Sequence, residues 1–88
     1  MNYQLLITSQ AEKQMAKLGK NLQDKVDEAI LTLESNPRPP NSLKLTTRKA
    51  WRLKIGEIRV VYEIDDKKKV VIILMVDFRK NIYKHLKQ

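Results

Sequence analysis

Arg52, Lys54 and Arg59 are the residues of this sequence whose types and spacing best suit chemistry. The three cations lie in two neighbouring segments on either side of Gly56-Glu57, where they alternate with apolar residues. Guanidinium and ammonium groups on a rigid scaffold bind phosphate oxygens and stabilise negative charge that develops during reaction at phosphorus. The pattern therefore predicts a site for a polyanion. The alternative is a solvated cationic face that protects a sheet edge from aggregation.

The turn between the two segments sets their pairing. Glycine at the first position of a two-residue loop is typical of a type II′ turn, so Gly56-Glu57 predicts a β-hairpin. In that register Lys54 lies directly across from Arg59, and Arg52 and Glu63 lie on the same face, Glu63 as its only anion. Like charges at opposed positions destabilise a hairpin, so a sheet optimised only for stability would lack this pair. The other face is apolar and is expected to be covered by helices. It comprises Trp51, Leu53, Ile55, Ile58, Val60 and Tyr62.

The C-terminal segment supplies further candidates. Arg79 and Tyr83 are four residues apart, so they share a face if this segment is helical. A tyrosine beside an arginine can stack on a base or donate a hydrogen bond, although packing at the sheet margin is the simpler alternative. Lys49 and Lys84 add positive charge and are predicted to bind substrate, whereas His85 is expected to be a surface residue.

The charge of the chain is unevenly distributed. It has 88 residues and a formal net charge of +8. Residues 1–36 contain four lysines and five acidic residues, whereas residues 37–88 contain fourteen cations and five anions. This basic second half indicates an acidic partner or a nucleic-acid backbone.

Composition also narrows the kind of site and the compartment. The chain has no cysteine and one histidine, which excludes a disulfide framework and a thiolate metal site, so no metal or other cofactor is expected. The N-terminus lacks a signal-peptide pattern. The longest apolar run has seven residues, far below the roughly 20 of a membrane-spanning helix. A cytoplasmic protein without membrane contact is therefore expected.

The first half of the chain is predicted to contain a strand and two helices. Tyr3–Thr8 has β-strand composition. Ser9 and Glu12 have the spacing of a capping box, which predicts a helix start, and Gly19 is expected to end that helix. Asn21 is expected to cap a second helix, whose apolar stripe ends before a proline-rich connector. The two helices together predict an αα-hairpin.

The second half is predicted to form a three-stranded antiparallel meander. The hairpin is followed by a turn at residues 65–68 and by Val70–Val76, whose apolar residues on both faces predict an interior strand. Residues 78–88 are predicted to form a short basic helix or an extended tail. The expected fold is α+β, with one domain over residues 1–88, the αα-hairpin packed on one face of the sheet and the cationic face uncovered.

The segment WRLKIGEIRVVYEIDDKKKVVIILMVDFRKNIY resembles the signature of the RelE/ParE superfamily of toxins from toxin–antitoxin systems. That signature begins with a first hairpin strand of Tyr, Arg, Leu and a second cation. After this strand the signature continues with a glycine turn, a strand ending in tyrosine, an acidic turn, and a last strand followed by Arg and Tyr. The resemblance extends over the whole chain in length and element order and implies the RelE-like fold.

Members of the RelE type are metal-free ribonucleases that enter the ribosomal A site and cut messenger RNA. The resemblance therefore implies an endoribonuclease (mRNA interferase) in which a ribose 2′-hydroxyl attacks the adjacent phosphate. Matching positions give Lys54, Arg59, Arg79 and Tyr83 as catalytic candidates and Arg52 as a substrate-binding residue. Within the family's pattern Lys54 is a candidate base, Arg79 a candidate acid, and Tyr83 a stacking or proton-transfer group.

The chain departs from the pattern at two places. Trp51 begins the first hairpin strand where tyrosine is commoner, which is a conservative change at an apolar position. Asp77-Phe78 stand where many members have Gly-His, so the imidazole that some branches use as acid or base is absent. Asp77 also places a negative charge beside Arg79, which could orient the arginine or weaken its hold on phosphate. Two other functions therefore remain open: inhibition of DNA gyrase, as in the ParE-like branch, and a catalytically inactive basic binding module of the same fold.

The resemblance also implies partners. Superfamily toxins are neutralised by an antitoxin, so an acidic RelB-like antitoxin is expected to cover the basic site in a hetero-oligomer. The ribosome and messenger RNA would be the targets of the free toxin.

Overall fold

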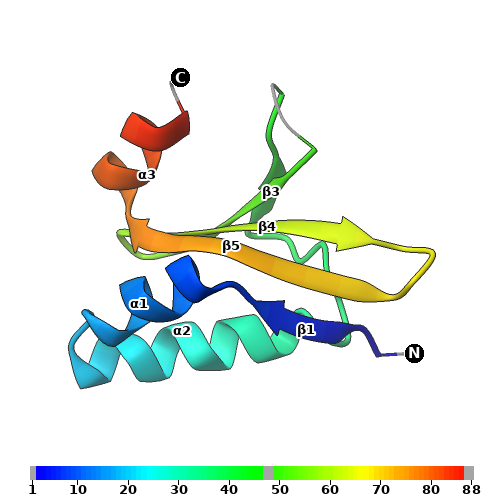
Figure 1. The fold of residues 1–88 in the computed structure, drawn as a ribbon, viewed down its shortest axis with the longest axis horizontal. Coiled ribbons are helices and arrows are strands. Elements are labelled where there is room, and N and C mark those ends of the chain that lie inside the picture. Colours follow the sequence, from blue (N-terminus) through cyan, green and yellow to red (C-terminus); the bar gives the residue numbers. More distant parts are fainter. Residues whose placement is uncertain (1, 47–48, 87–88) are drawn as a thin grey trace.

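The computed structural model describes residues 2–46 and 49–86, and within them a mixed sheet separates two helices on one face from a third on the other (Figure 1). The strand order is β1-β5-β4-β3-β2. The elements are β1 (Gln4–Ile7), α1 (Ser9–Ala16), α2 (Lys20–Thr32), β2 (Ser42–Lys44), β3 (Trp51–Ile55), β4 (Ile58–Asp65), β5 (Val70–Phe78) and α3 (Arg79–Leu86). No helix of this described part is long and apolar enough to cross a bilayer.

The first helix begins at Ser9, as predicted, but its cap lies one residue earlier. Thr8, not Ser9, is the N-cap: its backbone is extended, and its side-chain oxygen accepts a hydrogen bond from the backbone N–H of Ala11 at 3.2 Å. The N–H of Thr8 still donates to the carbonyl of Ile73 on β5, so this residue ends the strand pairing and starts the helix. The predicted helix start is therefore confirmed, but Ser9 is not the capping residue, because Thr8 provides a hydroxyl one position earlier.

The boundary between α1 and α2 also differs from the prediction. Gly19 does not end the first helix; it is the N-cap of α2 in an extended conformation, and Asn21 lies inside the helix. Glycine has no side chain that could accept a capping hydrogen bond. Instead, Gln23 from the first turns of α2 donates through Nε2 to the carbonyl of Leu18 at 2.8 Å. A side-chain hydrogen bond between residues five apart thus stabilises the junction, where the sequence pattern favoured a cap by Asn21.

The predicted hairpin is confirmed in its register. Lys54 pairs with Arg59, and Gly56 has φ of +57°, the positive value that the first position of a type II′ turn requires. β3, β4 and β5 form the predicted antiparallel meander, and β5 is an interior strand between β4 and β1. β1 runs parallel to β5, and β2 extends the other edge of the sheet. The three-residue β2 is too short to produce an alternating pattern, which is why the sequence did not predict it.

The αα-hairpin covers one face of the sheet, as predicted. Val26 and Ile30 of α2, and Leu33 at its C-cap, are buried against the apolar face of β3, β4 and β5. Tyr62 belongs to this core, and its hydroxyl donates to the carbonyl of Pro37 at 2.8 Å. This hydrogen bond satisfies a buried polar group and fixes the proline-rich connector to the sheet.

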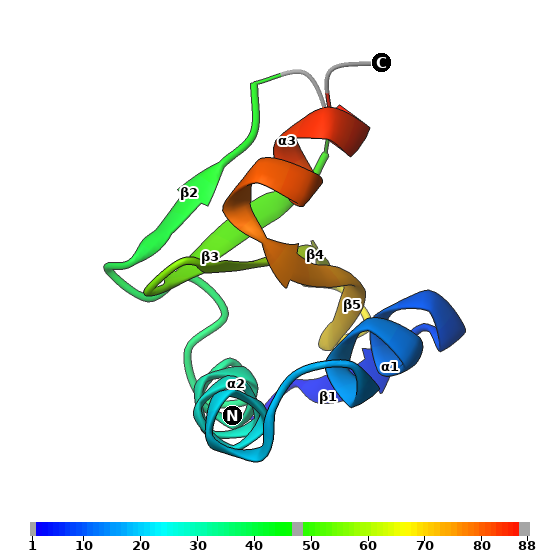
Figure 2. The ribbon, with the colours of Figure 1, turned by 90° about the vertical axis from the view of Figure 1, so that its left-hand side faces the viewer.

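The opposite, cationic face is not fully uncovered, because α3 packs on part of it. Ile82 of α3 is buried against Val61 of β4 and Met75 of β5, with Ala50 completing the cluster. Figure 2 shows α3 above the sheet and the αα-hairpin below it. Val61 and Met75 are the apolar residues that interrupt the charged pattern of this face, and they explain why the C-terminal helix docks there. The docking places α3 directly beside the cations of the hairpin.

Candidate active site

Strand pairing and the start of α3 bring the predicted cations together. Arg59 lies across from Lys54 on β3 and across from Asp77 on β5. α3 begins at Arg79, two residues beyond Asp77, and the Arg79 N–H donates to the carbonyl of Glu57 at 2.8 Å. This hydrogen bond fixes the β3–β4 turn to the first residue of the helix. The end of the sheet and the start of α3 therefore form one wall.

A hollow of about 390 Å³ opens at this place, which we call the cationic hollow. Its lining residues are Arg52, Lys54, Gly56, Glu57, Arg59, Arg79 and Tyr83. All four residues predicted to be catalytic are among them, together with Arg52, which was predicted to bind substrate. The structure thus brings together residues that are up to 31 positions apart in the chain.

Arg59 is the most unusual of these cations, because its side chain is buried. It is 5% exposed, and its Nη1 donates to the backbone carbonyls of Gly56 at 2.7 Å and Ile58 at 3.0 Å. Its Nε has no hydrogen-bond partner, and among the described residues it forms no ion pair. A buried charge without a counter-charge is costly. A bound anion would remove much of that cost.

Tyr83 connects the helix to the hairpin. Its hydroxyl accepts a hydrogen bond from Nη1 of Arg52, and the guanidinium of Arg79 lies 5.1 Å from the centre of its ring. The predicted sharing of a helical face by Arg79 and Tyr83 is therefore confirmed. The pKa of Tyr83 is lowered below its ordinary value of 10.0, chiefly by hydrogen bonding with Arg79. The positive charge of Arg52 and a contact with Arg59 also lower it. Three cations around one phenol favour its ionised form, so this group can exchange a proton more readily than an ordinary tyrosine.

The carboxylates of this face have structural partners. Asp77 accepts hydrogen bonds from the Phe78 N–H at 2.7 Å and from Nδ2 of Asn81 at 3.2 Å, so it stabilises the first turn of α3. It forms no ion pair with Arg79 in the part of the chain that the structure describes. The expectation that Glu63 is the only anion of this face was wrong, because Asp77 shares it in register with Arg59.

Glu57 is the lining residue that the prediction missed. It was assigned to the turn for its place beside Gly56, and nothing in the local pattern marked it as part of a site. Its position in the loop that joins the two cationic strands was the available signal. Its carboxylate is the only acidic group lining the cationic hollow among the described residues.

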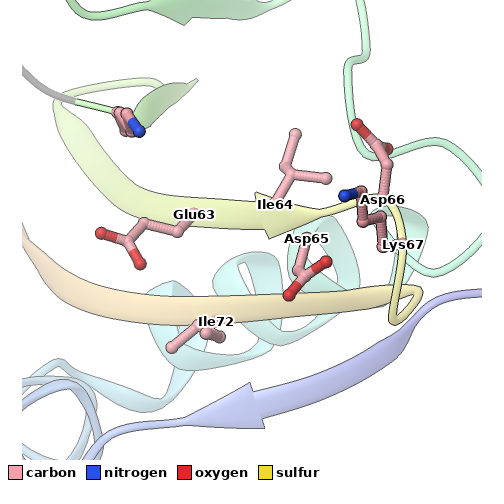
Figure 3. A pocket seen from close by; sticks show the side chains of 7 residues that line it. Glu63, Ile64, Asp65, Asp66, Lys67 and Ile72 are labelled. Carbon is pink, nitrogen blue, oxygen red and sulfur yellow. The ribbon is translucent and has the colours of Figure 1, made fainter.

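Both lysines that were predicted to bind substrate lie elsewhere. Lys49 lines a separate hollow of about 500 Å³ with Glu63, Asp65 and Asp66 (Figure 3). Lys84 is exposed on α3 and does not line the cationic hollow. The sequence could not distinguish these lysines from Lys54, which lines the cationic hollow. Their positions depend on how the loop before β3 and the helix α3 are oriented relative to the sheet. The side chain of His85, predicted to be a surface residue, lies outside the described part.

Comparison with known proteins identifies the family. The model of the family described as the ParE toxin of the type II toxin–antitoxin system parDE matches residues 5–83. The chain belongs to this family. It is therefore a toxin of a type II toxin–antitoxin system with the RelE/ParE fold, as the sequence resemblance implied. No curated protein sequence matches it.

Solved structures of RelE toxins share the fold. The toxin–antitoxin complex RelBE2 from Mycobacterium tuberculosis matches with 27% identity and a TM-score of 0.81 over 90% of this chain and 100% of that one. The archaeal RelE–RelB complex from Pyrococcus horikoshii matches with 29% identity and a TM-score of 0.81 over 90% and 97% of the two chains. The isolated Escherichia coli RelE toxin matches with 25% identity and a TM-score of 0.73 over 96% and 94%. These structures confirm the predicted α+β, RelE-like fold of this ParE-family toxin.

Proposed function

We propose that this toxin is a ribosome-dependent endoribonuclease that cuts messenger RNA at the cationic hollow. The observation that carries the proposal is Arg59 of β4, which is buried and forms no ion pair among the described residues, in a hollow whose other cations come from β3 and α3. A surface that served only for solubility would leave such cations exposed and separated. A site for phosphate requires them to be fixed and convergent.

The reaction is an internal transfer at phosphorus. The ribose 2′-oxygen attacks the adjacent phosphorus while the bond from phosphorus to the 5′-oxygen of the next nucleotide breaks, which leaves a 2′,3′-cyclic phosphate and a 5′-hydroxyl. One proton leaves the 2′-hydroxyl and one is added to the departing 5′-oxygen. Arg52 and Arg59 hold the phosphate oxygens and stabilise the charge that they gain. Lys54, Arg79 and Tyr83 are the groups placed to move the two protons, and the lowered pKa of Tyr83 supports its role in this transfer.

The partners follow from the same charge. An acidic antitoxin would bind the basic half of the chain and block the cationic hollow, and the related RelE toxins were solved with RelB antitoxins. The ribosomal A site is the proposed place of cleavage, and the cytoplasm the proposed compartment. In this proposal the residues of the hollow supply the transition-state charge stabilisation and proton transfer themselves.

A second candidate function is inhibition of DNA gyrase. The specific observation in its favour is that the matching family model is described as the ParE toxin. In that case the cationic hollow would bind protein and no RNA would be cut.

The deciding experiment maps the 5′ ends of messenger RNA by primer extension in a translating bacterial extract, with and without ribosomes. The proposal expects cuts on ribosome-bound message, loss of cuts with a 2′-deoxy nucleotide at the scissile position, and a loss of about 100-fold or more in Arg79→Ala. Lys67→Ala is the matched control, because Lys67 is an exposed cation in the turn before β5, outside the cationic hollow. Intact message with inhibited gyrase supercoiling would instead establish the second candidate.

A further inference from the structure

Phe78, the last residue of β5, is 41% exposed although its strand partner Ile58 is 1% exposed. Ile58 and Val76, which lie on the same face of the sheet, belong to the core, so the exposed ring is not a consequence of a loose strand. A single exposed apolar side chain needs no explanation by itself. What distinguishes Phe78 is the surface around it.

Phe78 lines a second hollow, of about 310 Å³, with Glu57, Arg79 and Lys80. Glu57 and Arg79 also line the cationic hollow, so the two hollows adjoin at these residues. The hydrogen bond from the Arg79 N–H to the Glu57 carbonyl, at 2.8 Å, holds this shared boundary in place. The aromatic ring therefore has a fixed position relative to the cations that would bind phosphate.

We propose that the second hollow is a nucleobase subsite, in which an unpaired base of the RNA strand stacks on Phe78 while a neighbouring phosphate lies in the cationic hollow. This inference rests on the proposed function, because it places more of the same substrate. Single-stranded RNA is bound by aromatic rings that stack on splayed bases beside cations that contact the backbone. The second hollow has both parts: Phe78 for the base, and Arg79 and Lys80 for the phosphates on either side. Glu57 is its hydrogen-bond acceptor for a base that presents an N–H group.

A protein segment is the competing occupant, because an acidic antitoxin would also be attracted to Arg79 and Lys80. The nucleobase is favoured by continuity: the second hollow shares two lining residues with a site that already has the charge and proton-transfer groups for a phosphodiester. An RNA strand that runs from one hollow to the other would pass both residues of their shared boundary, Glu57 and Arg79.

The test measures binding and is independent of cleavage. The purified toxin is titrated at low ionic strength into a fluorescent single-stranded oligoribonucleotide whose 2′-hydroxyls are methylated, so that it cannot be cut. A matched strand of the same length carries abasic sugars throughout. We expect Phe78→Leu to weaken binding of the strand with bases by roughly fivefold or more, with no change for the abasic strand, and Phe78→Tyr to bind both strands as the wild type does.

Leu31→Ala is the control, because Leu31 is a 57% exposed apolar residue on α2, far in the chain from either hollow. Equal binding of the two strands by the wild type, or equal effects of Phe78→Leu on both strands, would overturn the proposal. So would a Phe78→Leu variant that binds RNA normally but loses affinity for an acidic antitoxin, since that result would assign the second hollow to protein. Cleavage of ribosome-bound message by the wild type tests the proposed function separately, and it can succeed while the base subsite fails.

Discussion

Replacing Lys54 by glutamine should make the toxin more stable and less active. Lys54 is exposed on β3 and lies directly across from the buried Arg59 on β4. Like charges at directly opposed strand positions destabilise a sheet by about 0.2–1 kcal/mol. Asp77 lies across from Arg59 on the other side and offsets part of this repulsion, so we expect the free energy of unfolding to rise by about 0.5 kcal/mol. For a chain of this length that increase corresponds to roughly 2–4 °C in melting temperature.

The assay is thermal and urea unfolding of Lys54→Gln beside Lys44→Gln. Lys44 is the matched control, because it is also an exposed strand lysine but pairs with Trp51 and so has no cation across from it. The stability gain of Lys54→Gln should shrink at about 1 M salt, where the screening length falls to roughly 3 Å. In the translating extract the same variant should cut message about 100-fold or more slowly, since it lacks one of the groups placed to move a proton during the reaction.

Opposite signs for stability and activity are the core of this prediction. A Lys54→Gln variant that is less stable than the wild type at low salt would refute the reasoning, because the two cations would then not oppose each other in the folded chain. An equal gain in Lys44→Gln would refute it as well, since the effect would come from total charge and not from the strand pair.

Three further predictions concern ionisation and burial. In a spectroscopic titration of tyrosinate, Tyr83→Phe should remove the earliest ionisation step, because Arg79 lowers the pKa of Tyr83. The wild type should also gain stability relative to this variant as the pH rises from that lowered pKa towards 10.0. Tyr62→Phe should cost about 1–2 kcal/mol in urea unfolding, because the buried carbonyl in the proline-rich connector loses its hydrogen bond; an unchanged midpoint would contradict the role of that bond. Asp66→Asn should lower the melting temperature at neutral pH, because Arg38 pairs with Asp66 and holds its pKa below 3.8. The difference in melting temperature should vanish in acid, since the stabilisation by the ionised carboxylate is lost as the pH falls through the lowered pKa.

Local patterns determined the hairpin and much of the candidate site. The alternation around Gly56 and Glu57 specified one register, because a shift by one residue would turn every apolar side chain to the wrong face. That register alone placed Lys54 across from Arg59. The spacing of Arg79 and Tyr83 likewise predicted their contact, since residues four apart meet on any α-helix.

Helix ends were predicted less well, because several residues compete for each cap. Thr8 and Ser9 each carry a hydroxyl group that can cap a helix. Only the pairing of Thr8 with β5 decided between them. At Gly19 a contact from Gln23 replaced the local cap that the sequence suggested at Asn21.

The tertiary structure alone decided where the last helix docks and what it completes. Nothing local to residues 79–86 specified which face of the sheet they would cover; Val61 and Met75 did so, by offering apolar surface to Ile82 on the cationic face. That docking turned separate cations into one hollow, because it placed residues of α3 against the hairpin. Sequence by itself determined which chemical groups this toxin carries and their order along each element. Their convergence depended on packing between elements distant in the chain, which no local pattern encodes.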